Sequence, residues 1–132
     1  MAQRITREWL LRSTEGAFAL TPENVAIARS ILTAGWRARA LERGLPAPRD
    51  LEGACKFASL LVKLAFGGRI EGAWTHQYNV IAGQTIDLTG QSCDAGHDLV
   101  FFGNREHLAS MESCLPRVQT WLSALEAQLT TA

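Results

Sequence analysis

The chain has 132 residues, 47% of them apolar, and a formal net charge of zero. This length predicts one domain over residues 1–132, since domains commonly span ~100–150 residues, with a core that needs no disulfide or metal. The balanced charge argues against nucleic-acid and anionic-membrane partners, and no apolar run reaches the ~18 residues of a membrane helix. Met1–Gly16 lacks the apolar core of a signal peptide, and the chain has an odd number of cysteines, Cys55, Cys93 and Cys114. We therefore expect reduced thiols in a cytoplasmic protein.

The first half of the chain predicts three helices. Apolar residues recur at helical spacing over Ile5–Ser13. A second helix is expected to begin at Thr21, whose hydroxyl can cap it, with Pro22 at the first helical position, and to end at Gly44. A third helix, Leu51–Phe66, is almost wholly apolar, so other elements must cover most of its sides. It is expected to be the central helix of the domain.

Beyond Gly67-Gly68, which should break the central helix, the pattern favours extended structure. Strand-forming residues and a turn at Gly83 predict a hairpin, and a further strand is expected downstream. The expected extended segments are Arg69–Glu71, Trp74–Ala82, Gln84–Thr89 and Asp98–Phe102.

The last part of the chain returns to helical spacing. Asn104 is expected to cap a helix over Arg105–Ser113, and Leu115-Pro116 marks either a new helix start or a kink. An amphipathic helix then covers Val118–Leu129. Helices, a small antiparallel sheet and helices, in that order, predict an α+β fold in place of an alternating α/β fold.

Three residues on successive elements suggest nucleophilic catalysis. Cys55 lies near the start of the apolar helix, where backbone N–H groups and the helix dipole favour thiolate. His76 and Asp87 lie on the two strands of the hairpin, with Gly83 between them, so they should lie roughly opposite each other. An imidazole can lower the thiol pKa and protonate a leaving amine, and a carboxylate can fix the imidazole tautomer. The pattern predicts a Cys-His-Asp triad.

These residues also carry a family resemblance, which covers Glu52–Thr89. The stretch Gly53-Ala-Cys55-Lys-Phe-Ala58 resembles the cysteine helix of transglutaminase-like enzymes in the papain-like superfamily. His76-Gln-Tyr-Asn-Val80, Gly83 and Ile86-Asp87-Leu-Thr89 resemble the histidine–aspartate hairpin of that family. Small bacterial YunG-type proteins are more similar still, with Gly-Gly after the cysteine helix and then H-x-x-N…G…D-L-T.

The resemblance implies a papain-like domain whose cysteine helix packs on a short antiparallel sheet, flanked by N- and C-terminal helices. It implies a Cys55-His76-Asp87 triad and thiol-dependent acyl transfer or hydrolysis at an amide, of protease, amidase, deamidase or transglutaminase type. The substrate would be a protein, a peptide or a small amide, and no cofactor is expected. The alternative is an inactive papain-like fold that serves as a binding or assembly module.

The residues around the triad allow several interpretations. The Cys55 N–H is the natural first oxyanion donor, and Trp74, Gln77 and Asn79 are candidates for a second donor or a cleft wall. In an ideal strand Trp74 shares a face with His76, whereas Gln77 and Asn79 face away. Apolar-helix cysteines are most often inert packing, and Asp87 could cap an Asp-Leu-Thr-Gly turn.

Two other clusters are expected to carry no chemistry. Six residues downstream include metal-ligating types but lack the tight pairs of zinc sites, so no metal is expected; they are Cys93, Asp94, His97, Asp98, His107 and Cys114. Four arginines of the second helix predict a solvated helix side more readily than a phosphate site; they are Arg29, Arg37, Arg39 and Arg43.

Overall fold

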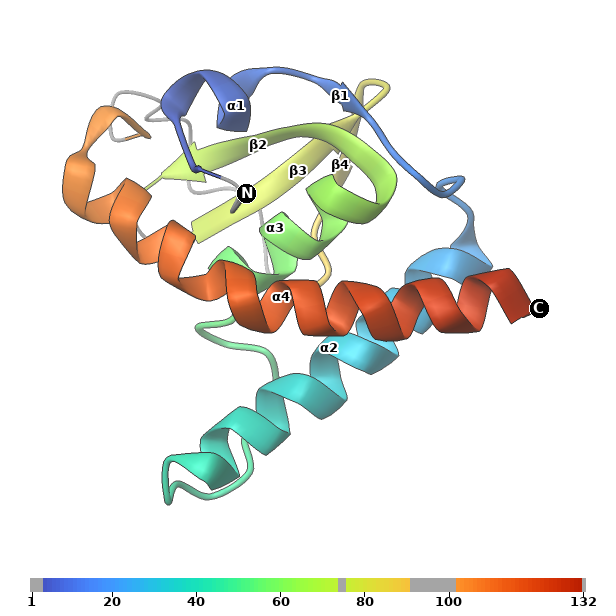
Figure 1. The fold of residues 1–132 in the computed structure, drawn as a ribbon, viewed down its shortest axis with the longest axis vertical. Helices are drawn as coiled ribbons and strands as arrows, with labels where there is room; N and C mark the ends of the chain where they lie inside the picture. The colour runs from blue at the N-terminus through green and yellow to red at the C-terminus, as the bar shows by residue number, and fades with distance from the viewer. Residues whose placement is uncertain (1–3, 74–75, 91–101, 132) are drawn as a thin grey trace.

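The computed structural model describes residues 4–73, 76–90 and 102–131, and it confirms the α+β class (Figure 1). Among these residues no helix is both long and apolar enough to cross a membrane. The helices are α1 (Arg7–Leu11), α2 (Pro22–Glu42), α3 (Cys55–Phe66) and α4 (Arg105–Thr131). The strands are β1 (Thr14–Glu15), β2 (Gly67–Ala73), β3 (His76–Ile81) and β4 (Gln84–Ile86).

Helix α2 begins and ends as predicted, whereas α3 is shorter than predicted. At the start of α2, the Thr21 Oγ1 accepts a hydrogen bond from the Asn24 N–H at 3.1 Å. Helix α3 begins at Cys55 and not at Leu51, because Gly53 has a positive φ of 84° and interrupts helical geometry. The Ala54 N–H then bonds to the Leu51 carbonyl in a separate turn, at 3.0 Å. This late start makes Cys55 the first residue of the helix.

The described part of the sheet is antiparallel, in the order β1-β2-β3-β4. The predicted hairpin is confirmed, with Val80 of β3 opposite Thr85 of β4. Strand β1 has only two residues, too few for a sequence pattern to predict, and it pairs with Gly67 and Gly68. Gly67 has a positive φ and no Cβ, and a Cβ there would overlap the Thr14 carbonyl. The Gly-Gly pair therefore lets β1 approach as well as ending α3.

The two expected C-terminal helices form one helix, α4, that runs through Pro116. Asn104 caps it as predicted, because its Oδ1 accepts from the N–H groups of Glu106 and His107 at 2.9 and 3.1 Å. Proline removes one backbone donor from the helix, and the Thr120 hydroxyl donates to the Pro116 carbonyl at 3.2 Å. The predicted strand Asp98–Phe102 lies outside the described residues except for Phe102, which is buried.

Helix α3 is the centre of the fold, as its composition predicts. It contacts β2 and β3 on one side and α2 and α4 on the other, so the elements surround it (Figure 1). Even its Lys63 is buried, with 2% of the residue exposed. The Lys63 Nζ donates to the carbonyls of Arg12 at 2.5 Å and Gly68 at 2.8 Å. This side chain ties the segment after α1 to the junction of α3 and β2.

Candidate active site

Cys55 occupies the first position of α3 and is partly buried. Its thiol donates a hydrogen bond to the Gln77 side-chain oxygen of β3, with 3.3 Å between Sγ and Oε1. The residue before it, Ala54, gives the helix no side-chain cap. The thiol therefore lies between the start of the central helix and the first residues of β3.

The Cys55 thiol is harder to ionise than an ordinary thiol. Burial raises its pKa, while hydrogen bonding from the Gln77 backbone and the charge of Lys56 lower it. The nearby charge of Asp87 raises the pKa again, and the net shift is upward. The expected lowering of the thiol pKa is therefore wrong for the resting protein, because desolvation outweighs the groups at the helix start.

His76 and Asp87 lie in contact, but the prediction that Asp87 lies on the paired strand is wrong. Strand β4 ends at Ile86, which pairs with Asn79, so Asp87 follows the strand and reaches His76 diagonally. The His76 Nε2 bonds to the Asp87 Oδ2, and each of the two side chains is only 8% exposed. Because Nε2 is occupied by the carboxylate, Nδ1 is the ring nitrogen left to exchange a proton with another group. The carboxylate thus sets the orientation of the imidazole.

The second oxygen of Asp87 holds a turn. The Thr89 N–H and hydroxyl both donate to the Asp87 Oδ1, at 3.0 and 2.6 Å. The turn closes with a bond from the Gly90 N–H to the Asp87 carbonyl at 3.2 Å. The turn interpretation of Asp87 is therefore confirmed through one oxygen, while the other oxygen contacts His76.

Cys55 and His76 are related through β3, because Cys55 bonds to Gln77, the residue that follows His76. Gln77 follows His76 directly, and its Nε2 donates to the Ala73 carbonyl at 2.8 Å, which fixes the amide that accepts from Cys55. Strand alternation turns Gln77 and His76 to different faces. Among the described residues, the thiol hydrogen bond therefore goes to Gln77 and the imidazole bond to Asp87.

The three candidate supporting residues have different positions. Gln77 contacts the thiol, whereas the buried Asn79 donates from Nδ2 to the Ser59 carbonyl of α3 at 2.9 Å. That bond holds α3 on the sheet. Trp74, the candidate on the His76 face, lies outside the described residues. The sequence pattern places Gln77 and Asn79 on one face of the strand but does not show that α3 covers that face.

The alternative metal cluster is only partly described. Cys93, Asp94, His97 and Asp98 lie outside the described residues, and His107 and Cys114 are buried on α4. Burial lowers the pKa of His107 to about 4, and the Cys114 thiol donates to the Ser110 carbonyl at 3.4 Å. Within the parts of the chain that the structure describes, no three side chains of metal-ligating type gather.

The candidate site comprises two pairs, the partly buried Cys55 with Gln77 and the buried His76 with Asp87, and His76 and Gln77 are adjacent in the chain. In comparisons with protein-family models, with curated proteins and with solved structures, no match to this chain was found.

Proposed function

We propose that this protein transfers or hydrolyses an acyl group at an amide, through the Cys55 thiol and in a papain-like arrangement. The observation that carries the proposal is the buried His76–Asp87 pair, next to the residue that holds the thiol. Burial of an oriented imidazole beside a helix-start cysteine fits a nucleophile with its general base and an orienting carboxylate. The substrate is a protein, a peptide or a small amide.

In the proposed reaction Cys55 attacks the substrate carbonyl carbon while its proton passes to His76. The carbon–nitrogen bond breaks, the imidazolium returns the proton to the leaving amine, and a thioester remains on Cys55. Water or an acceptor amine then attacks the thioester, gives a proton to the same imidazole and releases the thiol. Asp87 accepts from the imidazolium and stabilises its charge.

The resting contacts define what must change before attack. The thiol is held neutral by its buried position and donates to Gln77, so His76 has to take the proton during the reaction. For attack, the Cys55 side chain must leave the Gln77 amide and reach the imidazole Nδ1, although β3 turns Gln77 and His76 to different faces. Gln77 is thus a positioning residue that holds the thiol by a hydrogen bond before the reaction. The Cys55 N–H is the proposed oxyanion donor.

One observation favours the second candidate, a non-catalytic binding or assembly module. A thiol with a raised pKa that bonds to an amide is typical of cysteines that pack and do not react. In that case the His76–Asp87 pair would serve only to fasten the hairpin and its turn.

A burst experiment separates the two candidates. The protein is mixed with p-nitrophenyl acetate, and the initial release of nitrophenolate is compared with the acetylated position in a peptide map. We expect a stoichiometric burst with acetyl on Cys55, lost in Cys55→Ala and retained in Cys114→Ala, because the Cys114 thiol is only 5% exposed and burial raises its pKa. Acetylation of Cys55 no faster than that of Cys114 would support the module.

A further inference from the structure

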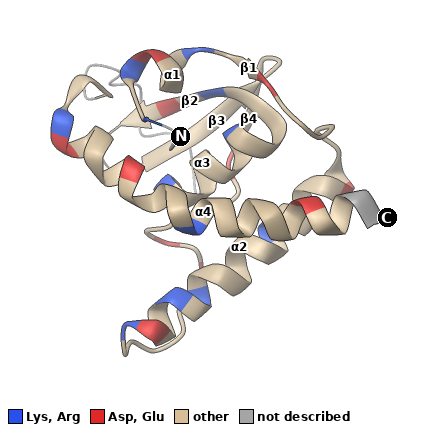
Figure 2. Cartoon of the chain, in the orientation of Figure 1, with Lys and Arg blue, Asp and Glu red and all other residues tan. Residues whose placement is uncertain are grey.

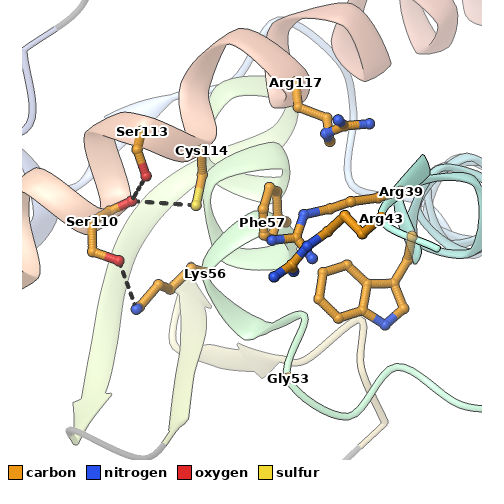
Figure 3. A pocket seen from close by; sticks show the side chains of 10 residues that line it. Arg39, Arg43, Gly53, Lys56, Phe57, Ser110, Ser113, Cys114 and Arg117 are labelled. Carbon is orange, nitrogen blue, oxygen red and sulfur yellow. Dashed lines mark hydrogen bonds between the residues drawn. The ribbon is translucent and has the colours of Figure 1, made fainter. Parts of the chain in front are cut away.

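A cavity of about 610 Å³ lies between α2, α3 and α4, away from the His76–Asp87 pair. Four cationic side chains line it: Arg39 of α2, Arg43 at the C-terminal cap of α2, Lys56 of α3 and Arg117 of α4. Figure 3 shows Arg39 and Arg43 extending from α2 toward Lys56 and Phe57, with Arg117 entering from α4. No acidic side chain is among the residues that line the cavity.

Most of this positive charge is not neutralised within the described residues. Arg117 pairs with Glu42 at 2.8 Å, but no carboxylate lies within ion-pair distance of Arg39 or Arg43 in the described parts of the chain. These two arginines stand four residues apart on one helix face, where like charges repel. Burial, followed by the charges of Arg43 and Arg117, lowers the pKa of Arg39. A bound anion would relieve this repulsion.

Two of the four cationic groups, Arg39 and Lys56, are already held in place. The Arg39 guanidinium carbon lies 5.0 Å from the Trp36 ring centroid and 5.1 Å from that of Phe57, which fixes its plane. The Lys56 Nζ donates to the Ser110 hydroxyl oxygen at 2.8 Å, so the hydroxyl proton remains free to donate to a ligand. Groups fixed before binding lose little conformational entropy when the ligand arrives.

We propose that this cavity binds a phosphate monoester as its dianion, with an aromatic or apolar group against Trp36. The cations come from three helices and so approach from different directions, which suits the three acceptor oxygens of a phosphoryl group. A carboxylate, with two oxygens in one plane, matches one arginine fork. The volume exceeds that of inorganic phosphate and falls in the ~300–1,000 Å³ range of small-molecule sites.

This site revises the interpretation of the α2 arginines as a solvated helix side. Figure 2 shows basic positions along the C-terminal end of α2. Arg29 and Arg37 are exposed and bond to the carbonyls of Leu88 and Pro48, whereas Arg39 and Arg43 line the cavity. The site does not rest on the proposed acyl transfer, because it uses none of the three triad residues.

Titration calorimetry with phenyl phosphate at pH 8, where the ester is a dianion, tests the site. We expect saturable binding to the wild-type protein, weakened about tenfold in Arg43→Gln and in Lys56→Gln through loss of a charge-assisted contact. Arg7→Gln removes an exposed arginine of α1 and should leave the affinity unchanged. Thermal unfolding of each variant verifies that it is folded.

Two further ligands test the chemical class. We expect inorganic phosphate and the aromatic dicarboxylate phthalate each to bind more weakly than phenyl phosphate. Failure of wild-type protein to bind phenyl phosphate, or equal affinity in Arg43→Gln, would overturn the site. Tighter binding of phthalate would overturn the phosphoryl assignment, and equal binding of inorganic phosphate would overturn the contact with Trp36.

Discussion

Asp87 uses its two carboxylate oxygens for two tasks, one in the turn with Thr89 and one at His76. This division separates its contribution to stability from its contribution to chemistry. An asparagine keeps the oxygen that accepts from Thr89 but places an NH₂ donor or a weaker acceptor at the imidazole. A substitution can therefore disturb the histidine while the turn remains.

We predict that Asp87→Asn leaves a folded protein in which acylation of Cys55 is slowed about 10²- to 10⁴-fold. An amide NH₂ facing Nε2 holds the proton on Nδ1, so the imidazole cannot take the thiol proton. The measurement is the burst rate with p-nitrophenyl acetate. Thr89→Val, which removes only the hydroxyl that donates to Asp87, serves as the control and should keep most of the rate. An unchanged rate in Asp87→Asn would remove Asp87 from the proposed site.

The raised pKa of Cys55 makes a separate prediction for its direct chemistry. Less thiolate is present at neutral pH than for a free cysteine, because burial disfavours the charged form. The rate of iodoacetamide labelling at Cys55 should therefore keep rising with pH above the ordinary thiol pKa of about 8.5. A labelling curve that reaches its plateau below pH 8 would contradict the neutral resting thiol.

How much of the site the sequence predicts depends on whether the contacts are local. The nearness of His76 and Asp87 is predictable, because both flank the turn at Gly83, but the end of β4 at Ile86 and the diagonal contact are not. The bond from Cys55 to Gln77 is not, because it depends on which face of the sheet α3 covers. The cationic cavity is not predictable from the sequence either, because Arg39, Lys56 and Arg117 come from three helices whose packing the sequence pattern does not give.

At the scale of elements, α3 is positioned by polar contacts as well as by its apolar surface. Asn79 bonds to its backbone from the sheet, and Lys63 bonds from the helix to the carbonyls of Arg12 and Gly68. The few polar residues of this apolar helix include Ser59 and Lys63, and their burial is not predictable, because polar residues on an apolar helix normally face solvent.

Lys63 gives this packing a dependence on pH. Burial lowers its pKa to about 8, whereas the unfolded chain has the ordinary lysine value of about 10.4. The unfolded chain thus binds the proton more tightly, and protonation of Lys63 costs the folded state stability below pH 8. As pH rises from 8 to about 10.4 this cost disappears, by up to about 1.4 kcal/mol per pH unit.

The test compares unfolding free energies of the wild-type protein and Lys63→Met in urea between pH 7 and 10.5. The unfolding free energy of the wild-type protein minus that of Lys63→Met should increase with pH. Ionisation of the cysteine thiols affects both proteins equally and cancels in this difference. A difference that stays constant over this range would show that Lys63 keeps an ordinary pKa in the fold.

At the scale of the whole molecule, α2 and α4 cross at a small residue. A Cβ at Gly35 of α2 would overlap the Trp121 indole of α4, which is only 7% exposed. Trp121 also packs on Phe57 of α3, with 5.6 Å between ring centroids, so this crossing fixes how the three helices meet. The cavity lined by Arg39 and Arg117 lies between these same helices.

We predict that Gly35→Ala lowers the free energy of unfolding by about 1–3 kcal/mol through overpacking. Helix propensity alone would make Gly35→Ala stabilising by about 1 kcal/mol. A destabilising effect therefore identifies the close contact with Trp121. Ser30→Ala at an exposed position of α2 should change stability by no more than about 0.5 kcal/mol. Stabilisation by Gly35→Ala, measured by urea unfolding, would contradict this packing.

The central claim is that His76 takes the Cys55 proton during acylation, and one rate ratio tests it most directly. The initial burst rate with p-nitrophenyl acetate at pH 7 is measured for the wild-type protein and for His76→Gln. Acetylation is followed at Cys55, with Cys114 as the internal reference. We predict that His76→Gln slows acetylation of Cys55 by about 10²- to 10⁴-fold and leaves Cys114 unaffected. Equal rates at Cys55 in the two proteins would contradict the account.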